Sequence, residues 1–363
     1  MHRGWLAIPA AAMLVAALGL TACSEDGDGS GGGGGAGKKI ALFLPESKTT
    51  RYEAFDRPLF EAKVKALCSD CQLLYFNADQ DAAKQQQQVE AALTQGANVL
   101  VLDAVDAAAV APLVNQAKQR KVPVIAYDRL ISGIDYAYYV SFNNVRVGEM
   151  QGQALLDAMN AQGSTAKGKV VFINGAPTDP SSADYKKGAH SVLDGKVQIG
   201  REFDTPDWSP DKAQQQMEQA ITALGRDNIV GVLSANDGMA GGAIAAMKRA
   251  GFAKLPPITG QDAELAAVQR ILTGEQYMTI YLDIRTEAEK SAELAVALSK
   301  GETPAAATTV DNGTAKIPAF LLDPIAVTAD KIKDTIIKDG FYKVAQICTA
   351  EVAAACTKQG IAE

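Results

Sequence analysis

Two hydrophobic patterns alternate along most of the 363-residue chain. Short continuous apolar runs, typical of strands buried on both faces of a parallel sheet, lie at residues 39–44, 99–102, 122–126, 169–173, 229–233 and 257–259. Stretches with apolar residues at helical spacing separate them, at residues 81–95, 107–120, 182–193, 210–224, 238–250 and 263–272. Strands that alternate with helices predict an α/β fold with doubly wound parallel sheets and right-handed crossovers.

The alternation restarts near residue 169, so we expect two similar lobes with a cleft between them. In open parallel sheets, ligands bind just beyond the carboxyl ends of the strands. Polar segments follow the predicted strands at residues 46–51, 103, 128–129, 174–182, 236–237 and 261–262. A single polar strand end would be weak evidence for a ligand site, but Asp, Asn and Arg recur at five or six of these strand ends. The sequence therefore predicts a polar ligand site in the cleft.

The first 22 residues predict a signal peptide. His2 and Arg3 precede an almost wholly apolar stretch at residues 5–20, which is shorter than the roughly 20 apolar residues of a membrane span. Leu-Thr-Ala-Cys then resembles the bacterial lipobox, so we expect cleavage before Cys23 and a lipid on its thiol. An ordinary secretory signal with an incidental Cys is the alternative. Residues 23–37 continue as a glycine-rich, flexible linker, which predicts an extracytoplasmic protein anchored by lipid to the outer face of the cell membrane.

Four further cysteines remain in the predicted mature chain, namely Cys68, Cys71, Cys348 and Cys356. An even number in an exported chain favours disulfides, and the local pairs 68–71 and 348–356 are preferred among three possible connectivities. A zinc site is the rival interpretation. It is disfavoured because the two pairs lie at opposite ends of the chain and His190 is the one histidine beyond residue 23. We expect no metal.

Charge and motif content exclude several classes of function. A formal net charge of −7 and the lack of a basic stripe argue against nucleic acid as a partner. The chain has no Gly-x-Ser-x-Gly and no His-Glu-x-x-His segment, and one mature histidine is too few for most triads and metal sites. We therefore expect a binding protein rather than an enzyme, with no cofactor. A glycosidase stays open as an alternative, because the spacing of its two carboxylates is spatial and not sequential.

The residue types at the strand ends suit a sugar. Each sugar hydroxyl donates and accepts hydrogen bonds, so a sugar site needs carboxylates and amide oxygens beside guanidinium groups. Asp128 and Arg129 supply such groups, although a structural ion pair is the alternative for them. Trp208, and Tyr52 beside Arg51, offer flat rings for the apolar faces of a sugar. For Trp208 the alternative is a packing residue at the start of a helix.

Five segments closely resemble the xylose-binding members of the periplasmic sugar-binding family. They read IAYDRLI at 125–131, SFNN at 141–144, SAND at 234–237, ITGQDAEL at 258–265 and IKDTIIKDGF at 332–341. The resemblance extends from residue 38 to about residue 343. It implies a type I periplasmic binding protein, in which a three-crossing hinge joins a first lobe (38–145 and 284–312) to a second lobe (146–283 and 313–363). It also implies a monosaccharide ligand and delivery to an ABC transporter permease, and we expect a monomer.

The resemblance also implies which residues contact the sugar. From the first lobe they are Arg51, Tyr52, Asp128, Arg129 and Asn143. From the second lobe they are Ser181, Trp208 as the stacking ring, Asn236 as the amide and Asp262 as the carboxylate. Asn143 and Ser181 stand where xylose binders often have Asp and Asn, respectively.

One departure leaves the identity of the sugar open. Xylose binders have a Lys that reaches the sugar at the position of Leu282, and leucine cannot donate a hydrogen bond. D-Xylose or a similar aldose is the first expectation, and glucose or another hexose is the second. Two other functions deserve comparison. A sensory protein that presents sugar to a receptor stays open, whereas a LacI-type regulator would carry a helix-turn-helix where this chain has an export signal.

Overall fold

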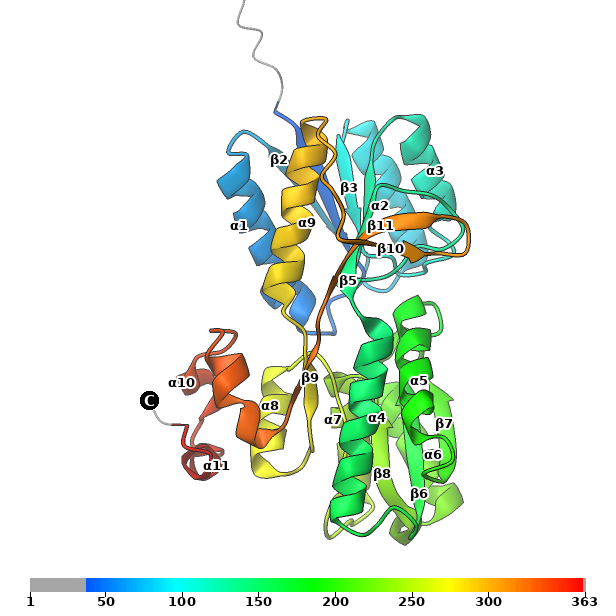
Figure 1. Cartoon of the computed structure of the whole chain (residues 1–363), viewed down its shortest axis with the longest axis vertical. Coiled ribbons are helices and arrows are strands. Elements are labelled where there is room, and N and C mark those ends of the chain that lie inside the picture. The colour runs from blue at the N-terminus through cyan, green and yellow to red at the C-terminus, as the bar shows by residue number, and fades with distance from the viewer. Residues whose placement is uncertain (1–36, 362–363) are drawn as a thin grey trace, which may run out of the picture. The chain divides into compact units, whose positions relative to one another are not determined.

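Two mainly parallel sheets organise residues 37–361, the part of the chain that the computed structural model describes (Figure 1). The first sheet has the strand order β10-β11-β5-β4-β3-β1-β2, and β10 alone runs antiparallel to its neighbour. Its strands are β1 (Lys39–Leu44), β2 (Gln72–Asn77), β3 (Val99–Leu102), β4 (Val124–Tyr127), β5 (Tyr138–Phe142), β10 (Thr308–Asp311) and β11 (Lys316–Leu322). The predicted signal peptide, Cys23 and nearly all of the linker lie outside the described residues.

The second sheet is built around β6. Its parallel core has the order β7-β6-β8, and isolated bridges from Val232 to Ile258 and from Gln261 to Ile280 continue it toward the antiparallel pair β9-β12. The strands are β6 (Lys169–Asn174), β7 (Ile199–Asp204), β8 (Ile229–Ser234), β9 (Thr279–Tyr281) and β12 (Ile325–Val327). The predicted strand at 257–259 is therefore a single bridge rather than a strand.

Helices follow most of the strands. In the first lobe they are the π-helical turn η1 (Tyr52–Asp56), α1 (Arg57–Leu67), α2 (Ala82–Thr94), α3 (Ala111–Gln119) and α9 (Ile284–Ser299). In the second lobe they are α4 (Asn144–Ala161), α5 (Pro180–Leu193), α6 (Pro210–Leu224), α7 (Asp237–Arg249) and α8 (Leu265–Thr273), with short turns at η2 (Pro206–Trp208) and η3 (Arg226–Asn228). The C-terminal segment holds η4 (Ala329–Lys331), η5 (Lys333–Ile337), α10 (Val344–Ile347) and α11 (Ala353–Lys358).

Both faces of the first sheet are buried, as a doubly wound fold requires. Ala41 and Phe43 of β1 join a core with α2 and α3, whereas Ile40, Leu42 and Leu44 join a second core with α1 and α9. Alternate side chains of a strand point to opposite faces, so one apolar run supplies two cores. The predicted α/β fold with doubly wound sheets is confirmed.

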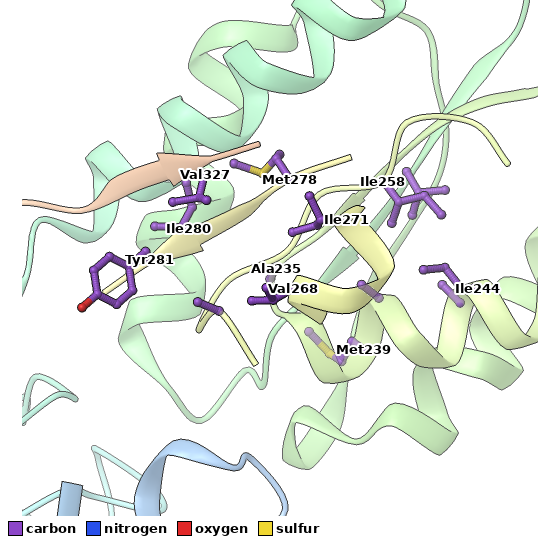
Figure 2. Close-up of a cluster of buried hydrophobic side chains, with 14 of the residues drawn as sticks. Ala235, Met239, Ile244, Ile258, Val268, Ile271, Met278, Ile280, Tyr281 and Val327 are labelled. Atoms are coloured by element: carbon purple, nitrogen blue, oxygen red, sulfur yellow. The ribbon is translucent and has the colours of Figure 1, made fainter. Parts of the chain in front are cut away.

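The second lobe repeats this arrangement. Val171 and Ile173 of β6 belong to a core with α6, α7 and α8, whereas Val170 and Phe172 face α4 and α5. Figure 2 shows part of the first of these cores, to which side chains of α7, α8 and β9 contribute. This packing fixes the loops that follow β6 and β8 at the edge facing the first lobe.

The chain crosses between the lobes three times (Figure 1). The crossings join β5 to α4, β9 to α9 and β11 to β12. The third predicted boundary, at residue 313, is wrong. Strand β11 pairs with β5 from Ala319 to Leu322 and so belongs to the first sheet, which moves the crossing beyond Leu322.

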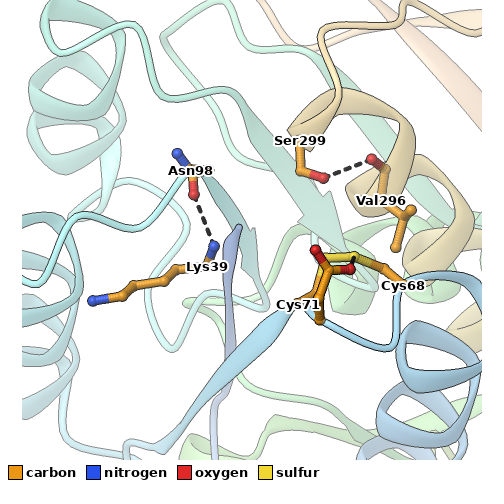
Figure 3. Close-up of a disulfide and its surroundings, with 7 residues drawn as sticks. Lys39, Cys68, Cys71, Asn98, Val296 and Ser299 are labelled. Atoms are coloured by element: carbon orange, nitrogen blue, oxygen red, sulfur yellow. Dashed lines mark hydrogen bonds between the residues drawn. A yellow bond between two sulfur atoms is a disulfide. The ribbon is translucent and has the colours of Figure 1, made fainter. Parts of the chain in front are cut away.

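The four described cysteines form the two local disulfides that the sequence favours. Cys68 pairs with Cys71 directly after α1 (Figure 3), and Cys348 pairs with Cys356 between α10 and α11. Within residues 37–361 no group of three or more His, Cys, Asp or Glu is placed to hold a metal ion. In the same range, none of the helices combines the length and the apolar character that crossing a bilayer would demand.

Candidate functional site

Arg51 organises the first-lobe side of the site. It lies at the start of η1 and is buried, and its guanidinium contacts three carboxylates. The distances are 2.7 Å from Nη2 to Oδ1 of Asp56, 3.2 Å from Nη1 to Oδ1 of Asp128 and 2.6 Å from Nη2 to Oε2 of Glu287. Burial acts to lower the pKa of Arg51, but these carboxylates raise it well above its usual value. Arg51 is thus a fixed positive charge that holds Asp128 in place.

Asp128 follows the last residue of β4 and has a left-handed backbone, with φ of 61°. Its carbonyl oxygen accepts hydrogen bonds from Ser141 Oγ at 2.7 Å and Tyr139 Oη at 3.1 Å. Its carboxylate accepts from Arg51 and, at 3.3 Å, from Tyr52 Oη. Aspartate tolerates this backbone region better than most residues, so the strand can end in a sharp turn that aims the carboxylate along the cleft.

Arg129 connects the first lobe to the second. Its Nη1 donates to the carbonyl oxygen of Ala104 at 3.0 Å and its Nη2 to Tyr52 Oη at 3.3 Å. Its Nε lies 3.3 Å from Oδ1 of Asp103 and 3.1 Å from Oδ2 of Asp179, in ion-pair contact without hydrogen-bond alignment. Asp179 belongs to the second lobe, where it caps α5. The ion pair therefore spans the two lobes.

Trp208, Asn236 and Asp262 approach from the second lobe. Trp208 ends the turn η2, and its ring lies edge-on to Tyr185, with 6.3 Å between ring centroids. Asn236 caps α7 through its Oδ1, which accepts from the backbone nitrogen of Met239 at 3.0 Å. Asp262 has φ of 92° and accepts at Oδ1 from Gln261 Nε2 at 3.3 Å.

Burial raises the pKa of Asp262 to about 7, although Arg51 acts in the opposite direction. The buried Asp103 behaves similarly, because burial raises its pKa well above the usual value while Arg129 opposes the shift. With a pKa near neutrality, the Asp262 carboxyl group can both donate and accept hydrogen bonds. The site therefore offers both kinds of partner to a ligand.

A small cavity lies between these groups. The residues that line it come from both lobes and are Thr49, Arg51, Tyr52, Asp128, Arg129, Asp179, Tyr185, Trp208, Asn236, Gln261 and Asp262. Trp208 Nε1 and Gln261 Oε1 are buried and have no hydrogen-bond partner within residues 37–361. Buried polar atoms are almost always paired, so these two atoms point to a polar ligand.

Seven of the nine residues predicted to contact a sugar line this cavity, whereas Asn143 and Ser181 do not. Asn143 is exposed and caps α4 by accepting from the backbone nitrogen of Arg146 at 3.1 Å. Ser181 is buried in α5, where it accepts from Asn144 Nδ2 at 3.1 Å. Both side chains serve local structure, which corrects their assignment to the lining. Leu282 is fully buried in the second-lobe core and does not line the cavity either.

Four lining residues were not among the predicted ones, namely Thr49, Asp179, Tyr185 and Gln261. Thr49, Asp179 and Gln261 fall inside the polar strand-end segments, so the strand-end rule contained them without selecting them. Tyr185 lies within α5, one turn after its start. A tyrosine in a helix gives no sequence signal that separates a site residue from a core residue.

Comparison with known proteins gives three closely related findings. Residues 40–303 match the model of a periplasmic binding protein domain. The chain is 35% identical over 314 residues to the D-xylose-binding periplasmic protein of Escherichia coli, which covers 85% of this chain and 92% of that protein. It is 36% identical over 309 residues to the D-xylose-binding periplasmic protein of Haemophilus influenzae, with 84% and 90% covered.

A solved structure agrees with these findings. An ABC transporter solute-binding protein from Clostridium phytofermentans, with bound β-D-glucose, has a TM-score of 0.80 and 28% identity to this chain. The match covers 85% of this chain and all of that one. The similarity therefore includes both lobes.

Proposed function

We propose that this chain, which belongs to the periplasmic binding protein family and to its sugar-binding ABC transporter components, captures one aldose between its lobes. The observation that carries the proposal is the cavity. Asp128 and Arg129 of the first lobe and Trp208 and Asp262 of the second line one shared space. Because polar groups and an aromatic ring from both lobes converge on one small space, the site suits one sugar ring better than an oligosaccharide.

The chemistry of the lining supports a neutral, hydroxyl-rich ligand. Arg129 offers a planar donor group, Asp128 offers acceptors, and Gln261 Oε1 and Trp208 Nε1 offer an acceptor and a donor that lack protein partners within the described chain. The Trp208 ring provides an apolar surface for the C–H face of a sugar. The positive and negative side chains already compensate one another across the site, so a charged ligand is not needed.

D-Xylose or a similar aldose is our first candidate, because two relatives at 35% and 36% identity are D-xylose-binding proteins. The structure with bound β-D-glucose supports a hexose as the second candidate. After capture, the closed protein would deliver the sugar to the permease of an ABC importer. We further propose that the chain works outside the cytoplasm, held by a lipid on Cys23.

A thermal-shift screen tests this function. A ligand that binds the native state alone raises the unfolding temperature by mass action. We expect D-xylose, D-glucose or a related monosaccharide to raise it by several degrees at millimolar concentration, whereas disaccharides such as maltose have no effect. If no monosaccharide shifts the transition, or if labelled oligosaccharides are cleaved on incubation, the proposal fails.

A further inference from the structure

Trp208 is held in an unusual backbone conformation. Asp207 and Trp208 both have left-handed backbones, with φ of 61° and 52°. Residues other than glycine seldom adopt this conformation, which persists only where their surroundings hold them. Here the Asp207 carboxylate pairs with Lys212 Nζ at 2.5 Å, and the Asp207 carbonyl oxygen accepts from Gln80 Nε2 of the first lobe at 3.4 Å.

Gly175 lies directly after β6 and under the Trp208 ring. A Cβ atom on Gly175 would lie 2.0 Å from Cη2, 2.3 Å from Cζ2 and 2.4 Å from Cζ3 of Trp208. These three distances are nearly equal, which places that Cβ position over the face of the six-membered ring rather than beyond its edge. One face of the indole is therefore covered by the Gly175 backbone, and only the opposite face is available to a ligand in the cavity.

We propose that Gly175 is a positioning residue that sets the depth of the cavity and thereby the size of sugar accepted. This inference rests on the proposed function. Carbon atoms in contact are about 3.5–4.0 Å apart, so a Cβ at Gly175 would displace the indole by roughly 1.5 Å. The turn that carries Trp208 is fixed by its strained backbone and by Lys212 and Gln80, and the open direction for the ring is the cavity.

The displaced ring would discriminate between sugars by size. A hexopyranose carries a hydroxymethyl group that a pentopyranose lacks, so a shallower cavity penalises the hexose more. Glycine at position 175 therefore keeps the cavity open to the larger aldose, whereas any side chain there would restrict it to pentoses.

Intrinsic fluorescence allows a direct test, because the sequence contains two tryptophans, Trp5 and Trp208. In the full chain with Trp5→Phe, the emission reports on Trp208 alone. We expect Gly175→Ala in this background to shift the sugar-free emission and to lower the ratio of D-glucose to D-xylose affinity about tenfold, which is within the range of overpacking effects. Gly238→Ala is the matched control, since a Cβ there meets nothing closer than 3.5 Å; it should change neither quantity.

A second substitution separates the Trp208 contact from a general loss of folding. Trp208→Phe removes the ring atoms nearest to Gly175, so Gly175→Ala/Trp208→Phe should fold normally and recover the glucose-to-xylose ratio of Trp208→Phe alone. An unchanged emission and an unchanged affinity ratio in Gly175→Ala would overturn the inference. So would a double variant whose ratio of D-glucose to D-xylose affinity is no higher than that of Gly175→Ala. If the parent chain binds neither sugar, the proposed function fails, and the emission shift still tests the role of Gly175.

Discussion

Two aspartates with left-handed backbones face each other across the cavity. Asp128 follows β4 with φ of 61°, and Asp262 precedes α8 with φ of 92°. Strain of this kind concentrates at functional sites. The two residues differ in their partners, since Asp128 contacts the Arg51 guanidinium at 3.2 Å, whereas the neutral Gln261 is the donor to the Asp262 carboxylate. We infer that Asp262 changes its protonation near neutral pH.

The raised pKa of Asp262 predicts a pH-dependent effect of Asp262→Asn on stability. An unfolded aspartate loses its proton near pH 3.9, whereas the folded Asp262 loses it at about pH 7. Between these values the folded state holds more protons, so the parent's free energy of unfolding falls as the pH rises. The Asp262→Asn variant lacks this titrating group. Its free energy of unfolding, relative to that of the parent, should therefore rise from pH 4 to pH 8 by about 1.4 kcal/mol for each unit of pKa shift.

Urea unfolding of both sugar-free chains at pH 4.5, 6 and 8 measures this difference in the free energy of unfolding. Asp283→Asn is a suitable control, because Asp283 lies at the start of α9 outside the cavity lining. A stability difference between Asp262→Asn and the parent that stays the same at all three pH values would contradict the assignment.

At the residue scale, the sequence predicted the site where strand ends carry charge. Asp128, Arg129 and Asp262 could be predicted because each closely follows the end of a predicted strand. The ends of parallel strands lie beside the ligand site, and a charged residue there is easily recognised in the sequence. Asn143 and Ser181 were assigned wrongly to the lining, because a polar residue after a strand serves equally well as a helix cap or a buried hydrogen-bond partner. The choice between these roles depends on side-chain direction, which the sequence pattern does not contain.

At the element scale, continuous apolar runs located the central strands well. Strands β1 and β3 have the predicted bounds, and helix α6 matches its predicted range. The strands β2 and β7 were not predicted. Each lies at the edge of its sheet and is partly exposed, and in β7 the polar residues Arg201 and Glu202 interrupt the apolar run.

Two long helices, α4 and α9, were not predicted, because buried polar residues interrupt their apolar pattern. The buried side of α4 includes Gln151, whose Nε2 donates to the carbonyl oxygens of Ala235 and Gly260 at 3.1 Å each. The buried side of α9 includes Glu287, which pairs with Arg51. Both residues break the hydrophobic period that marks a helix. Their burial is compensated by hydrogen bonds and ion pairs that form only in the folded chain.

At the scale of the whole molecule, direct contacts join the two lobes around the cavity. Arg129 reaches Asp179 at 3.1 Å on one side. On the other side, Phe55 of η1 stacks on Phe341 of the C-terminal segment, with 4.2 Å between ring centroids. These contacts stabilise the arrangement in which both lobes line the cavity, so we expect them to favour the closed form that the proposed ligand would occupy.

Asp179→Asn tests this interlobe ion pair. An asparagine keeps the cap of α5, where Asp179 Oδ1 accepts from the backbone nitrogen of Ser181 at 2.8 Å, but it removes the charge that faces Arg129. We expect a larger radius of gyration in small-angle scattering without sugar and an affinity about tenfold lower. Asp194→Asn, at the other end of α5 and paired with His190, should change neither. An unchanged radius and affinity in Asp179→Asn would show that the ion pair does not favour closure.

The most direct test of the central claim is calorimetric titration of the parent chain and Asp128→Asn with the sugar that the thermal-shift screen selects. Asparagine tolerates the left-handed backbone at position 128, and Arg51 keeps Asp56 and Glu287 as partners, so the variant should stay folded. We predict one sugar per chain for the parent and roughly 10- to 100-fold weaker binding for Asp128→Asn, because hydrogen bonds to a charged acceptor are lost. Equal affinity in the two chains would contradict a sugar site between Asp128 and Asp262.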